Sequence, residues 1–135
     1  MRRLTTICIL AATYVLYGCT PINIDEVLLQ RDDISITVKG VLHMSFNEAT
    51  CQLGYNGKKN EFRVLEDNIG NWFVLTCSER PSATGQEVIC SLNWTSSTDT
   101  ESLKGLNFTV KNLNENGMIW LWCQSEEIGV VVKEL

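Results

Sequence analysis

The stretch ISITVKGVLHMSF, residues 34–46, indicates the fold class of this chain. Apolar and polar side chains alternate over residues 34–39, and the alternation resumes after Gly40 over residues 42–46, with Leu42 on the apolar side. A period of two residues is the signature of a β-strand with one buried and one exposed face. We therefore expect two half-buried strands, with a bulge or tight bend at Gly40.

Further short strands follow toward the C-terminus. Residues 51–55 and 62–65 are predicted to form a hairpin, because Asn56-Gly57 between them tolerates the positive φ that such turns need. A second pair joins residues 72–77 to residues 88–94 through a polar connection. The remaining strands are expected at residues 106–110, 118–123 and 128–132.

Strands at this spacing indicate an all-β domain. We predict an antiparallel β-sandwich of about seven to nine strands, immunoglobulin-like in architecture. A small β-barrel is the alternative. The position two before Cys123 is Leu121, where the tyrosine corner of immunoglobulin domains would place a tyrosine, and this argues against that family proper.

The N-terminal residues have the composition of an export signal. Arg2 and Arg3 precede an apolar run over residues 4–17, which is shorter than the roughly 18 apolar residues of a spanning helix. Gly18-Cys19, preceded by Leu16, resembles a bacterial lipobox, which implies that Cys19 is acylated and becomes the mature N-terminus. Ordinary secretory cleavage near Gly18 with an unmodified Cys19 is the alternative.

This interpretation divides the chain into three parts: a lipoprotein signal peptide at 1–18, a lipidated N-terminus and tether at 19–33, and the β-domain at 34–135. Removal of the predicted signal peptide would take away Arg2 and Arg3. The mature chain would then carry 9 of the 11 basic residues against 16 acidic ones, a net charge of −7. Such a charge argues against a nucleic-acid partner. It also means that acyl chains, and not a basic patch, would hold the protein at a membrane.

Catalytic residues are not evident. The only histidine, His43, shares the parity of Ser45 and is expected on the polar face, and no nucleophile is placed beside it. Acidic residues are scattered, so the paired carboxylates of a hydrolase are not indicated. We expect no cofactor and no metal site, and a non-enzymatic protein.

Four cysteines follow the lipobox: Cys51, Cys77, Cys90 and Cys123. Four thiols allow three pairings, and none lies in a C-x-x-C motif. Cys77 and Cys90 would face the same way on two strands that pair, so they are the candidate disulfide. Buried thiols that pack as small apolar groups are the alternative.

Tryptophans supply the candidate binding residues. On the strand at 118–123 both faces are apolar, with Trp120 and Trp122 on one of them, so one face needs cover from a loop, the N-terminal segment, a partner or a ligand. Exposed tryptophans would stack on sugars or anchor a protein. Trp72, next to Phe73 that is expected to point into the core, is likewise a candidate binding residue. Burial in the core is the alternative for all three.

The segments at 52–56, 71–78, 102–106 and 120–123 resemble small lipoproteins of Bacteroidetes that carry one β-rich domain of unknown function. The resemblance implies a lipid-anchored location in the bacterial cell envelope, at the outer membrane, with the surface and periplasmic sides both open. We expect a binding module for a glycan or an envelope protein. A structural or assembly component that pairs through its edge strands is the alternative.

Overall fold

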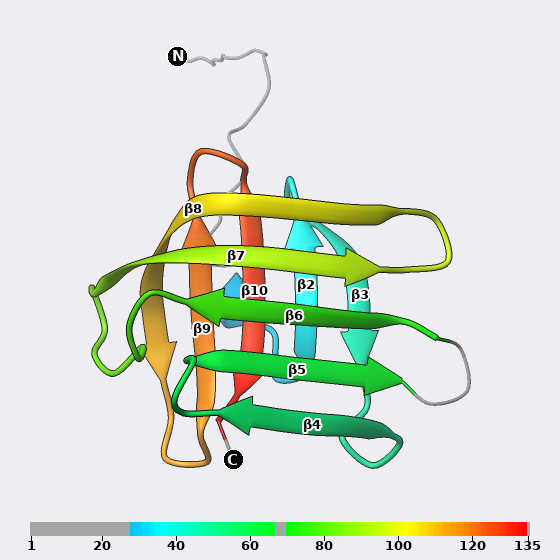
Figure 1. Cartoon of the computed structure of the whole chain (residues 1–135), viewed down its shortest axis with the longest axis horizontal. Coiled ribbons are helices and arrows are strands. Elements are labelled where there is room, and N and C mark those ends of the chain that lie inside the picture. Colours follow the sequence, from blue (N-terminus) through cyan, green and yellow to red (C-terminus); the bar gives the residue numbers. More distant parts are fainter. Residues whose placement is uncertain (1–27, 67–69, 135) are drawn as a thin grey trace, which may run out of the picture.

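The structure, a computed structural model, describes residues 28–66 and 70–134 (Figure 1). After a helical turn at 28–30, the described chain forms antiparallel strands that belong to one sheet. In chain order they are β2 (Ile34–Val38), β3 (Val41–Phe46), β4 (Cys51–Asn56), β5 (Glu61–Glu66), β6 (Trp72–Cys77), β7 (Glu87–Thr95), β8 (Thr100–Leu113), β9 (Met118–Cys123) and β10 (Ile128–Lys133).

The strand order in the sheet is β3-β2-β10-β9-β8-β7-β6-β5-β4. Each strand from β4 to β10 pairs with its neighbour in the chain, and β10 then pairs with β2. The two edges of the sheet are β3 and β4, which are consecutive in the chain. Because only residues 47–50 connect them, the two edges lie near each other and the sheet curls almost into a barrel. The all-β class is confirmed, and the single curled sheet corresponds to the small barrel of the two architectures considered.

The long strand β8 carries the sheet from one side of the barrel to the other. In Figure 1, β4 to β7 run across β2, β3, β9 and β10, and β8 bends between the two groups. Its pairing slips once against β7, between Cys90 and Leu92, and once against β9, between Val110 and Asn112. The first slip lies opposite Gly105, whose φ of 68° suits a bulge. These irregularities let one strand serve both groups.

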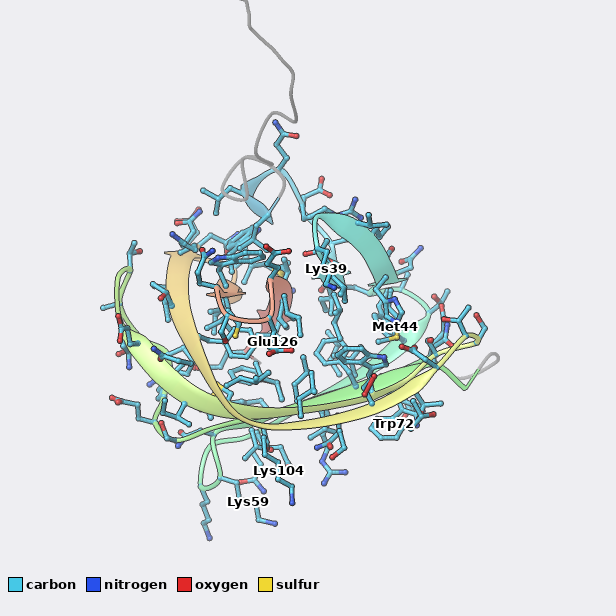
Figure 2. All side chains as sticks on the ribbon, turned by 90° about the horizontal axis from the view of Figure 1, so that it is seen from above. Lys39, Met44, Lys59, Trp72, Lys104 and Glu126 are labelled. Carbon is cyan, nitrogen blue, oxygen red and sulfur yellow. The ribbon has the colours of Figure 1, made fainter. Side chains whose placement is uncertain are left out.

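The core lies inside this curve, where the side chains of both groups meet (Figure 2). Phe46 of β3 and Phe73 of β6 pack against each other, with ring centroids 5.6 Å apart and ring planes tilted by 59°. The edge strand β3 is therefore fixed to the opposite side of the barrel by packing as well as by its pairing with β2.

A second, smaller buried layer lies on the outer face of β2, β10 and β9, and it corrects the expectation of a half-buried first strand. Ser35 and Thr37 are only 1% and 3% exposed. The N-terminal turn provides cover, because a Cβ placed on Gly129 would lie 2.7 Å from Cδ1 of Leu28 and 2.5 Å from Oγ1 of Thr37. Leu28, expected in the tether, is fully buried on this face.

The predicted hairpins are confirmed, with one correction in β3. Lys39 and Gly40 both have positive φ and make the tight bend between β2 and β3. Two residues later the register slips, because Ile36 pairs with Met44 and Thr37 pairs with Leu42. His43 is the extra residue of this bulge. Leu42, expected to point inward, therefore shares the outer face with Thr37 and is 44% exposed.

Candidate functional site

The candidate site is a hollow on the outer face of β4, β5 and β6. The strand register builds it from two cross-strand rows. One row is Gln52, Leu65 and Trp72, and the other is Gly54, Arg63 and Val74. Alternate residues on these strands, such as Phe62, Val64 and Phe73, point into the core. The alternation that builds the core thus leaves this outer face with an aromatic ring, two aliphatic side chains and two polar side chains.

Glycine in the middle of β4 makes room for the hollow. A Cβ on Gly54 would lie in ordinary van der Waals contact with Cβ of Arg63, at 3.8 Å, so a small side chain would fit there without a clash. The hollow has a volume of about 500 Å³. This lies within the roughly 300–1,000 Å³ of small-ligand sites. Figure 2 shows Trp72 on the outer side of the sheet, together with Lys59 and Lys104, whereas Met44 lies inside.

An ion pair next to the hollow orients its guanidinium group. Nε of Arg63 donates to Oε1 of Glu61 at 2.8 Å, and the hydroxyl of Thr76 donates to Oε2 of the same carboxylate at 3.4 Å. The hydrogen bond from Arg63 is the largest influence on Glu61 and lowers its pKa. Within the described part of the chain, the Nη groups of Arg63 make no hydrogen bond and stay available to a ligand.

Trp120 and Trp122, the other tryptophans named from the sequence, lie away from this hollow. They are 7% and 5% exposed on the outer face of β9, next to the N-terminal turn. Nε1 of Trp120 donates to the backbone carbonyl of Arg31 at 2.8 Å, and Nε1 of Trp122 donates to Oε1 of Gln124 at 3.0 Å. Of the cover types considered, the N-terminal segment provides it, and these rings have no open face for a ligand.

A second polar cluster lies at one mouth of the barrel, and the sequence did not reveal it. Oδ1 of Asp99 accepts hydrogen bonds from Ser96 Oγ at 2.7 Å and Trp94 Nε1 at 3.0 Å, and lies 2.8 Å from His43 Nε2. The bulge in β3 turns His43 toward this carboxylate and places its ring 5.3 Å from that of Trp94. The sequence pattern around His43, a polar residue between the apolar Leu42 and Met44, is the same as that of a histidine on the surface, so the sequence alone did not predict this cluster.

The mouth cluster is organised as a clamp between β3 and the β7–β8 hairpin. The hydrogen bond from Ser96 is the largest cause of the lowered pKa of Asp99, with further contributions from Trp94 and His43. The Ser96 hydroxyl donates to the carboxylate and not to the imidazole, so the order of a Ser-His-Asp triad is absent from this cluster. Its pocket, about 190 Å³, is below the usual size of a small-ligand site.

The remaining predictions concern the cysteines, metal ligands and the N-terminal segment. Cys77 and Cys90 face each other as buried thiols. The described residues contain no group of three or more His, Cys, Asp or Glu side chains placed to hold a metal ion. In the same residues no helix is long and apolar enough to cross a membrane. The predicted signal peptide at 1–18 and the lipidation candidate Cys19 lie outside the described residues.

Comparisons with protein-family models, with curated proteins and with solved structures found no match for this chain.

Proposed function

We propose that this chain is a non-enzymatic lipoprotein of the bacterial cell envelope, anchored at the outer membrane through acylated Cys19, and that its β-domain binds a glycan in the Trp72 hollow. The lipobox and the resemblance to small Bacteroidetes lipoproteins support the location. The observation that carries the binding role is the placement of a tryptophan, an amide and a guanidinium around one open hollow.

The chemistry of the hollow suits a sugar better than a wholly apolar ligand. An indole offers a flat apolar face, on which the C–H face of a sugar ring stacks. Gln52 and Arg63 add amide and guanidinium donors on neighbouring strands, within reach of ring hydroxyls. Small-ligand sites commonly combine apolar walls with a few polar groups in this way.

The absence of an ordered triad in the mouth cluster supports a binding role over a catalytic one. His43 and Ser96 both turn to the same oxygen of Asp99, so neither activates the other. The two carboxylates of a glycosidase would have to face each other across the ligand. The hollow is lined by apolar, amide and guanidinium groups in place of such a pair.

The experiment is a binding comparison between Trp72→Ala and a matched control. Ile89→Ala removes an apolar side chain that is 50% exposed on the outer side of β7, away from the hollow. Full-length protein in detergent is applied to an array of neutral and acidic oligosaccharides, and dissociation constants are measured for those retained. Loss of a central aromatic contact is expected to weaken binding at least about tenfold in Trp72→Ala, and Ile89→Ala is expected to bind as the wild type does.

Equal binding by both variants would remove the hollow as the site. Retention of no oligosaccharide at all by the wild-type protein would contradict the glycan proposal itself.

A second candidate function, assembly through edge strands, is favoured by the ends of the sheet. Among the described strands, β3 and β4 each pair with only one neighbour. Val41 at the start of β3 is 69% exposed, an apolar residue on an open edge. Such edges are templates for added strands. Co-purification of a stable envelope partner that is lost on Val41→Lys would support this function, and a strictly monomeric protein without partners would exclude it.

A further inference from the structure

We propose that Cys77 and Cys90 are a disulfide site, and that the two cysteines become joined across β6 and β7 when the chain folds in the presence of a disulfide oxidant. In the structure they are free thiols, with Sγ atoms 3.1 Å apart. A disulfide is about 2.05 Å long, so the sulfurs need to approach by about 1 Å.

The strand register favours this bond. Cys77 and Cys90 are directly opposite each other in the antiparallel pair. The adjacent opposite pair is Ser78 and Ile89, in which Ser78 N donates to Ile89 O at 2.8 Å. Hydrogen-bonded and non-hydrogen-bonded pairs alternate along such a ladder, so Cys77 and Cys90 form a non-hydrogen-bonded pair. In that kind of pair the Cα atoms are about 4.5 Å apart, which lies within the range of natural disulfides.

The connection between the two strands holds this register. Oε1 of Gln86 accepts hydrogen bonds from the backbone N–H groups of Ser82 and Ala83, at 2.7 and 3.2 Å. Its Nε2 donates to the carbonyl of Arg80 at 2.9 Å. One side chain thus organises the loop from within, and the two cysteines stay opposite each other without the covalent bond.

The chemistry is an exchange with an oxidised dithiol. The thiolate of one cysteine attacks the oxidant's disulfide and releases one thiol, and the thiolate of the second cysteine then attacks the mixed disulfide and releases the other. Two electrons and two protons pass to the oxidant, which is reduced to two thiols. Both sulfurs are buried, so the exchange takes place before the core closes. The inference rests on the proposed export only in that the envelope supplies such oxidants.

The test needs no ligand and no lipid. Unfolded, reduced full-length chain is refolded in mixed reduced and oxidised glutathione, and its remaining thiols are alkylated in urea so that burial cannot protect them. Cleavage on the carboxyl side of glutamate, at exposed Glu79 and Glu87, separates the two cysteines, whereas trypsin cuts poorly between Arg80 and Pro81. Mass spectrometry is expected to find the two peptides linked, with the mass of two hydrogen atoms lost, and to find them separate after reduction.

The control is Cys90→Ser, in which Cys77 is expected to be fully alkylated. Alkylation of both cysteines in the refolded wild-type chain would overturn the proposal, as would linkage of either one to any other cysteine of the chain. Resistance of Cys77 to alkylation in Cys90→Ser would also overturn it. The glycan array reads a different face of the sheet, so failure of one experiment does not imply failure of the other.

Discussion

At the scale of single residues, the hydrogen bonds of the indole N–H groups distinguish two buried tryptophans from the partly exposed Trp72. The indole N–H of Trp120 is used by the carbonyl of Arg31, and that of Trp94 by Asp99. The indole N–H of Trp72 makes no hydrogen bond within the described part of the chain. A buried indole normally finds a partner for its N–H, so the distribution agrees with the burial of the first two rings and the partial exposure of the third.

The Trp120–Arg31 hydrogen bond predicts a difference between two identical substitutions. Trp120→Phe leaves the carbonyl of Arg31 without its partner, whereas Trp122→Phe releases only the exposed side chain of Gln124 to water. We expect Trp120→Phe to lower the free energy of unfolding by about 1 kcal/mol more than Trp122→Phe. Urea denaturation measures both values, and equal losses would show that the bond to Arg31 contributes nothing.

The Asp99 clamp predicts a pH dependence of stability. Because hydrogen bonds lower the pKa of Asp99 in the folded state, its carboxylate contribution is complete above the unfolded pKa of about 3.9 and is lost as the pH falls through the lower, folded value. Asp99→Asn should therefore be less stable than the wild type at neutral pH, with the gap closing in acid.

Denaturation midpoints across acidic pH give this comparison. Asp32→Asn is the control, because the exposed Asp32 carboxylate takes part in no hydrogen bond of the described residues. A constant gap between Asp99→Asn and wild type at all pH values would contradict the clamp.

At the scale of elements, the docking of the N-terminal turn on β10 depends on the absence of a side chain at Gly129. A Cβ there would lie within 2.7 Å of Leu28 and Thr37 side-chain atoms. We expect Gly129→Ala to destabilise the protein by about 1–3 kcal/mol, through displacement of the turn.

The matched control is Gly54→Ala in β4, where the added methyl meets no atom closer than 3.8 Å and the change should stay within about 0.5 kcal/mol. Hydrogen exchange at residues 28–31 should rise only in Gly129→Ala. An unchanged exchange rate in that variant would contradict the docked turn.

Local periodicity predicted the strands because each one has a core-facing row, as in Phe73, Leu75 and Cys77 of β6. It missed the bulge at His43, since a bulge depends on the partner strand and leaves no mark in the alternation itself. The sequence also placed the positive φ of the β4–β5 hairpin at the wrong residue. Asn56-Gly57 does begin the turn, but the residue with positive φ is Asn60. Turn type depends on loop length, which the dipeptide alone does not fix.

At the scale of the whole molecule, burial depends on which distant segments meet. Ser35 and Thr37 look solvent-facing in the sequence, but they are buried where β2 lies beside β10 and the N-terminal turn. Trp72 was identifiable as a candidate from its residue type. Its grouping with Gln52 and Gly54 was not, because that grouping requires the register of three strands. The N-terminal turn thus covers Trp120 on the outer face of β9, whereas Trp72 on the outer face of β6 stays partly exposed.

Trp72 is the one partly exposed tryptophan of the described residues, whereas Trp94, Trp120 and Trp122 are buried. Hydroxyl-radical footprinting read by mass spectrometry measures this difference, because it reports the exposure of each of the four tryptophans in one sample. We predict that Trp72 is oxidised much faster than the other three, and that an oligosaccharide retained on the array slows its oxidation alone. Oxidation of Trp120 or Trp122 as fast as that of Trp72 would contradict the burial of these two rings and the exposure of Trp72.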